Sequence, residues 1–133
     1  MQRTLSIKFL IMAVIFAVFS FMIYMGMQAP VNQDNVCQLF KDHPRWYRAA
    51  YRSQDKWGVP ISVQMAIIRY ESHFRANAKP RHKLFGFIPW VPASSANGYT
   101  QALEGTWREY LQATHQSSAS RANFSNATDF IGW

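Results

Sequence analysis

The 133-residue sequence contains a single cysteine, Cys37, and only seven acidic residues. One cysteine excludes an intramolecular disulfide and a metal site built from several thiolates. The histidines have no metal-ligand spacing among themselves, and no glycine-rich phosphate loop, basic repeat or internal repeat is present. We therefore expect no metal, no other cofactor and no nucleic-acid partner.

Charge is also absent from residues 9–27, a run of nineteen mostly apolar residues. About 20 apolar residues match the thickness of the hydrocarbon core of a membrane. Arg3 and Lys8 precede the run, which places the N-terminus in the cytoplasm by the positive-inside rule. We predict a membrane anchor over residues 1–29, as a single pass through the inner membrane. The alternative is a cleaved signal peptide, which the length of the run and the Pro30 that follows it disfavour.

The rest of the chain is long enough for one small domain. Residues 30–43 are polar and predict a stalk, and residues 44–133 predict the domain, in the periplasm or outside the cell. After residue 29 the sequence has twelve basic and seven acidic residues, a net charge of +5. This charge suits an anionic partner such as a membrane surface or a cell-wall polymer, or serves solubility alone.

Helical signals dominate the domain. Apolar spacing predicts a helix over residues 44–57 and a central, largely buried helix over residues 60–74. A capping box from Thr106 to Glu109 opens a third helix, and a fourth starts near Ser125 or Asn126. Residues 76–98 hold three prolines and predict a long loop. No segment alternates as a strand does, so the sequence predicts an all-α fold.

Glu71 ends the predicted central helix, three residues after Ile68 and four after Ile67. This spacing predicts that it shares their inward face. A carboxyl group held against apolar walls has a raised pKa, which suits a general acid near neutral pH. The alternative is an ion pair with a nearby basic residue: Arg69, Arg75 or Lys79.

The order of two short motifs carries a resemblance to a known family. Glu71-Ser72 follows the predicted buried helix, and Gly98-Tyr99-Thr100-Gln101 precedes another helix. Over residues 45–133 the sequence resembles the soluble lytic transglycosylase (SLT) domain, which has the goose-type lysozyme fold. Two departures stand out: twenty-five residues separate Ser72 from Gly98, where the family has a short segment, and the family's third motif, Ala-Tyr-Asn or similar, does not follow.

The resemblance implies a lytic transglycosylase that cleaves the β-1,4 bond between N-acetylmuramic acid and N-acetylglucosamine in peptidoglycan. Glu71 would act alone as acid and then base, giving a 1,6-anhydro product. Glu104 is open as a second acid or as part of a solvated face. Substrate-binding residues implied or suggested for the groove are Ser72, Gly98, Tyr99, Gln101 and Trp90.

Several of these roles have structural alternatives. Ser72 would orient Glu71 or the substrate, or cap the helix end. Trp90, like Phe85 and Phe87, would stack on sugar rings or pack the loop onto the domain. The alternative function is a non-catalytic peptidoglycan-binding or secretion-assembly module, with cell-envelope assembly proteins as partners. A third class, a small membrane-disrupting protein, is disfavoured by the two ordered motifs.

Overall fold

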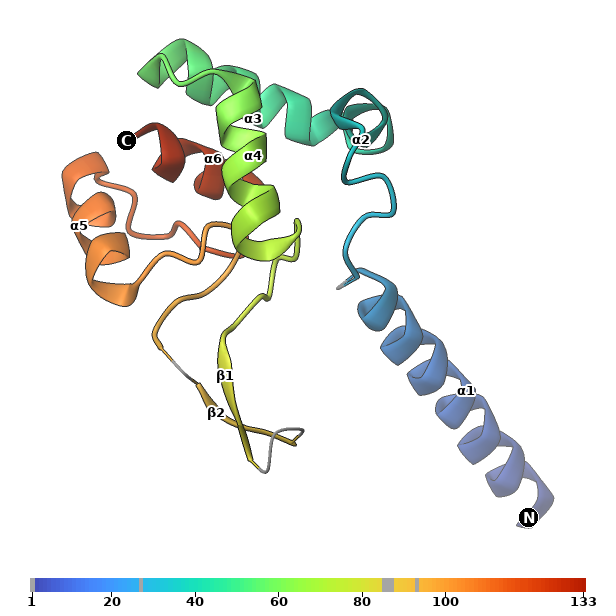
Figure 1. Cartoon of the computed structure of the whole chain (residues 1–133). Helices are drawn as coiled ribbons and strands as arrows, with labels where there is room; N and C mark the ends of the chain where they lie inside the picture. The colour runs from blue at the N-terminus through green and yellow to red at the C-terminus, as the bar shows by residue number, and fades with distance from the viewer. Residues whose placement is uncertain (1, 27, 85–87, 93) are drawn as a thin grey trace.

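The computed structural model describes residues 2–26, 28–84, 88–92 and 94–133, with side chains described for 8–24, 28–80 and 94–133 (Figure 1). Its helices are α1 (Gln2–Gly26), α2 (Val36–Asp42), α3 (Pro44–Trp57), α4 (Ile61–Ser72), α5 (Glu104–Thr114) and α6 (Phe124–Gly132). Two strands, β1 (Arg81–Leu84) and β2 (Ile88–Pro92), lie between α4 and α5.

The predicted N-terminal helix forms as α1, which extends away from the other helices (Figure 1). Large apolar side chains along it, from Phe9 to Tyr24, are exposed. Within the described residues, however, no helix has the length and apolar character needed to cross a membrane.

The predicted polar stalk is wrong over its second half, where α2 forms. Asn35 caps this helix, because its side chain accepts a backbone N–H at 3.0 Å. Leu39 of α2 is fully buried in the core, which explains why this stretch folds onto the domain. An ion pair between Asp34 and Arg69 also joins the segment to α4.

The two predicted helices in the middle of the chain are confirmed, with one correction. Helix α3 ends at Trp57, and Gly58 caps it with a left-handed φ of 80°, as glycine commonly does. Helix α4 is not buried on nearly all faces. Met65 and Ile68 are buried, but Tyr70 is 85% exposed. Only the stripe of α4 that contains Met65 and Ile68 packs on the core. The side chains of Val63 and Tyr70 face solvent.

The last two helices exist where the sequence predicts them, but their starts differ. Helix α5 begins at Glu104, and Leu103 is its N-cap, so the predicted capping box does not form. Helix α6 begins at Phe124, within two residues of its predicted start. Its cap is Asn123, whose side-chain oxygen accepts two backbone N–H groups of the first turn, at 2.9 and 3.2 Å.

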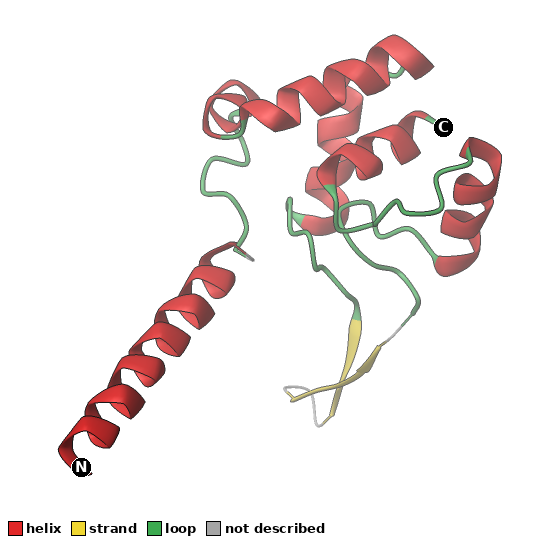
Figure 2. Ribbon diagram, turned by 180° about the vertical axis from the view of Figure 1, so that it is seen from behind, coloured by secondary structure: helices red, strands yellow, loops and turns green. Residues whose placement is uncertain are grey.

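The predicted loop over residues 76–98 contains an antiparallel hairpin, so the all-α class holds for the helical body alone. Arg81 pairs with Pro92 and Leu84 with Ile88, with an irregularity in the register between them. Figure 2 shows the hairpin projecting from the helices. The sequence did not predict the second strand because it contains Pro89 and Pro92. Proline lacks an N–H donor and is compatible only with an edge strand. In a two-stranded hairpin both strands are edges.

The core of the domain is strongly aromatic. The ring of Trp46, on α3, stacks on Phe124 of α6 with centroids 4.2 Å apart and planes 2° apart. Tyr99 and Phe74 pack against the same indole, each with centroids 5.8 Å away. Helices α3 and α6 therefore pack along each other, and the segments around residues 74 and 99 are anchored on that pair.

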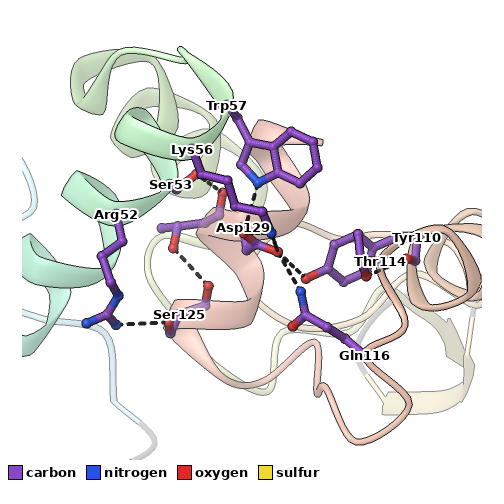
Figure 3. A network of polar contacts seen from close by, with 10 residues as sticks. Arg52, Ser53, Lys56, Trp57, Tyr110, Thr114, Gln116, Ser125 and Asp129 are labelled. Atoms are coloured by element: carbon purple, nitrogen blue, oxygen red, sulfur yellow. Dashed lines mark hydrogen bonds and ion pairs between the residues drawn. The ribbon is translucent and has the colours of Figure 1, made fainter.

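A polar network centred on Asp129 joins three helical segments (Figure 3). This carboxylate of α6 accepts hydrogen bonds from the indole N–H of Trp57, the hydroxyl of Tyr110 and the amide of Gln116, each at 2.8 Å, and from Lys56 Nζ at 3.1 Å. Burial favours the neutral acid, but the four hydrogen bonds favour the carboxylate and hold the pKa of Asp129 below its ordinary value.

Replacing Asp129 by asparagine is expected to lower the free energy of unfolding by roughly 1–3 kcal/mol near neutral pH. A lowered folded-state pKa contributes stability above the unfolded-state pKa, and that stability is lost as the pH falls through the folded-state pKa. The difference between wild type and Asp129→Asn should therefore shrink from about pH 7 to about pH 3. Urea titrations followed by tryptophan fluorescence measure both values.

The matched control is Asp55→Asn, because Asp55 is exposed on α3. This control should change stability by less than about 0.5 kcal/mol at both pH values. An Asp129→Asn loss that is equal at both pH values would contradict the charged network.

Candidate active site

The candidate acid, Glu71, lies in the last turn of α4 and is exposed. The prediction that it shares the inward face of Ile68 is wrong. The buried stripe of α4 runs through Met65, Ile68 and Ser72, and Glu71 borders it on the solvent side. Each residue turns an α-helix by about 100°, so Glu71 lies about 60° around the helix axis from Ile68. Because the buried stripe is narrow, this offset places Glu71 outside it.

Two of the three basic residues named as ion-pair partners for Glu71 have other contacts. Arg69 pairs with Asp34, and Arg75 donates from Nε to the carbonyl of Ser72 at 3.0 Å. No ion pair in the described part of the chain includes Glu71. Its carboxylate thus faces solvent at the helix end, where a substrate can reach it.

Ser72, in contrast, is fully buried. Its hydroxyl donates to the carbonyl of Ile68 at 3.0 Å, one turn earlier in α4. Its own carbonyl accepts the backbone N–H of Arg75 at 3.1 Å. The hydroxyl therefore has the helix-end role that was the alternative to contact with a substrate.

Directly after α4 the chain makes an unusual turn. His73 and Phe74 both have left-handed backbones, with φ of 52° and 58°. Left-handed non-glycine residues are energetically unfavourable and persist where their surroundings enforce them, often at functional sites. Here the surroundings are the core, because Phe74 is 2% exposed and stacks on Trp46. The turn fixes the direction in which the chain leaves Glu71.

One carbonyl, that of Ala78, joins the second motif to the segment that follows this turn. It accepts the backbone N–H of Gly98 at 3.0 Å and the side-chain amide of Gln101 at 2.8 Å. The same amide also donates to the carbonyl of Gly98 at 2.8 Å. Since Ala78 is seven residues beyond Glu71, the structure brings the segments of the two motifs together.

Tyr99 lies between the motif and the core. It is 7% exposed, and its ring packs edge-on against Trp46 and Phe124. Burial raises the pKa of its hydroxyl to about 12, so it is a neutral hydrogen-bonding group at physiological pH. Tyr99 also lines a cavity of about 450 Å³ between α3 and the start of α6.

Arg121 holds the second motif in place, and sequence reasoning missed it. Its guanidinium donates to the carbonyls of Ser95 at 2.9 Å and Ala102 at 3.0 Å, one on each side of the motif. Its Nη2 donates to Glu104 at 2.6 Å, and its own carbonyl accepts the N–H of Tyr99 at 3.2 Å. Arg121 stands in a loop rich in small residues, and no pattern in that loop signals its contacts.

Of the other residues considered for the site, the structure describes the side-chain contacts of Glu104 but not those of Trp90. Glu104, open as a second acid, is engaged by Arg121. Trp90 lies in β2, but its side chain, like all of Phe85 and Phe87, falls outside what the structure describes. Among the described residues, no three His, Cys, Asp or Glu side chains are grouped so that they could hold a metal ion.

Comparison with known proteins gives one match. A family model described as "Transglycosylase SLT domain" matches residues 9–133. No curated protein and no solved structure matches the chain.

Proposed function

Because the chain belongs to the transglycosylase SLT domain family, we propose that it is a lytic transglycosylase acting on peptidoglycan. The bond cleaved is the β-1,4 link between N-acetylmuramic acid and N-acetylglucosamine. The observation that carries the proposal is the shared carbonyl of Ala78, which joins the segment beyond Glu71 to Gly98 and Gln101. Exposure of Glu71 leaves its carboxyl group accessible to a glycan strand laid across this junction.

In the proposed reaction Glu71 serves first as acid and then as base. Its proton goes to the glycosidic oxygen as the bond to the anomeric carbon breaks. Its carboxylate then takes the proton of the muramoyl 6-hydroxyl, whose oxygen attacks the anomeric carbon and closes the 1,6-anhydro ring. One carboxylate suffices for this cycle, unlike the paired carboxylates of most glycosidases. The ion pair between Glu104 and Arg121 is consistent with a single catalytic carboxylate.

The hydrogen bonds of Gln101 within the chain support a narrower role for it in this proposal. Both protons of its side-chain amide are used within the chain, one by Ala78 and one by Gly98. The group left for a ligand is its carbonyl oxygen, which is an acceptor. We therefore assign Gln101 to the N–H of an N-acetyl group rather than to its carbonyl.

A second candidate function is a peptidoglycan-binding or secretion-assembly module without catalysis. Exposure of Glu71 favours it. A general acid near neutral pH ordinarily needs burial or a neighbouring charge to raise its pKa. The enzymatic proposal therefore requires the bound glycan itself to exclude water from Glu71.

The two functions are separated by incubating the full chain, kept soluble in mild detergent, with purified sacculi. Mass spectrometry of the released material should show anhydro-muropeptides if the enzymatic proposal holds. Reducing-end products would instead indicate a hydrolase. Intact sacculi that carry the protein into the pellet would favour the binding module.

We also propose, from the apolar run of residues 9–27, that the protein is held at the inner membrane with the domain on the periplasmic side. Support comes from the exposed apolar side chains of α1 and from the basic residues before them. Fractionation of cells should recover the full chain with membranes after a carbonate wash. Recovery in the soluble fraction would contradict this location.

A further inference from the structure

A cavity of about 450 Å³ lies between α3 and the loop that leads into α6. Three arginines of α3 line it, Arg45, Arg48 and Arg52. Their spacing of three and four residues places them on one face of the helix, so all three point to the same side. Across the cavity stand Ser125 of α6 and Tyr99 of the second motif.

The positive charge of this cavity is not balanced within the described part of the protein. None of its three arginines takes part in an ion pair there. Arg52 makes one long contact, from Nη2 to the hydroxyl of Ser125 at 3.4 Å (Figure 3). Like charges gathered on one wall repel one another, and a concave site of one sign concentrates oppositely charged ligands.

The start of α6 adds to the positive potential without supplying the binding groups. Its dipole favours an anion at this end. The side chain of Asn123 already accepts the N–H groups of Ser125 and Asn126. A ligand in the cavity would therefore be held by guanidinium groups rather than by backbone N–H groups.

We propose that this cavity binds a carboxylate of a peptidoglycan stem peptide. The planar guanidinium groups match a carboxylate with paired hydrogen bonds. Tyr99 joins the cavity to the segment that carries Gln101, and stem peptides branch from every N-acetylmuramic acid of the strand. The inference rests on the proposed function and adds to it that the substrate carries its peptides.

The arginines are exposed, so each contributes a modest, salt-sensitive share of binding. Replacing two of them, as Arg45→Gln with Arg48→Gln, should lower the affinity for a soluble tetrapeptide stem with free carboxylates by about five- to tenfold. Isothermal titration of the full chain in detergent measures this. The same peptide with amidated carboxylates should bind the wild type as weakly as the free peptide binds the double variant.

The matched control is Lys41→Gln with Arg108→Gln, which removes equal charge from two positions that do not line the cavity. The control should leave peptide affinity unchanged, and circular dichroism should confirm that both double variants are folded. Equal loss in the control, or equal binding of amidated peptide, overturns the site. Tighter binding of inorganic phosphate than of the peptide overturns the assignment of the ligand.

This inference fails separately from the proposed function. One outcome is that the chain cleaves glycan strands without peptides as fast as intact strands, and that the arginine variants change neither rate. That outcome would support the enzymatic proposal and contradict the stem-peptide site. If no substrate is cleaved but the titration shows arginine-dependent peptide binding, the site stands and the catalytic proposal falls.

Discussion

Replacing Glu71 by glutamine is expected to lower the rate of anhydro-muropeptide release by about 10²–10⁴-fold, the usual share of a general acid-base group. Glutamine keeps the size and polarity of the side chain but can neither donate a proton to the glycosidic oxygen nor accept one from the 6-hydroxyl. The proposed mechanism has no second carboxylate to compensate. Quantitative mass spectrometry of digests over a time course measures the loss.

The matched control is Glu109→Gln on α5, another exposed glutamate changed in the same way. It should leave the rate within about twofold of wild type, because a surface change away from a site has little effect. Glu71→Gln should also unfold at the same urea concentration as wild type, since the Glu71 side chain makes no hydrogen bond or ion pair in the described part of the chain. A Glu71→Gln variant that keeps full activity would remove Glu71 from the chemistry.

The secondary structure was predictable where local signals are strong. Gly58 marked the end of α3 correctly, because a left-handed cap suits glycine over any other residue. The hairpin was missed, because its prolines argue against strands unless both strands are known to be edges. Helix α2 was missed, because seven residues carry little periodicity and Leu39 is buried by contacts distant in the sequence.

The sequence shows the order of the two motifs of the candidate site but not the geometry that the site adopts. The order of Glu71 before Gly98 and Gln101 is visible in the sequence, and the structure joins the two segments at Ala78. Glu71 is exposed because only a narrow stripe of α4 meets the core. The apolar pattern of the sequence predicted a wider buried face, which would have included Glu71. The contacts of Arg121 depend on tertiary structure, since its partners lie 17 to 26 residues away.

Gly98→Ala is expected to be the most destabilising single change in the second motif. Gly98 has a φ of 78°, a conformation that costs an L-residue roughly 1–2 kcal/mol. A Cβ atom there would also lie 2.1 Å from the carbonyl oxygen of Arg121, a backbone atom. That carbonyl accepts the N–H of Tyr99, so moving it breaks a hydrogen bond as well. Together these effects predict a loss of about 3–5 kcal/mol in the free energy of unfolding.

Two other glycines separate the contributions to that loss. Gly58 has a φ of 80° but open space around it, so Gly58→Ala should cost only the backbone term of about 1–2 kcal/mol. Gly105 lies in α5 with open space and no left-handed backbone, so Gly105→Ala should stabilise by up to about 1 kcal/mol. Urea titrations should therefore rank the three variants with Gly98→Ala lowest and Gly105→Ala highest. Equal losses at residues 98 and 58 would show that the contact with Arg121 relaxes freely, and the second motif would then not be held by that loop.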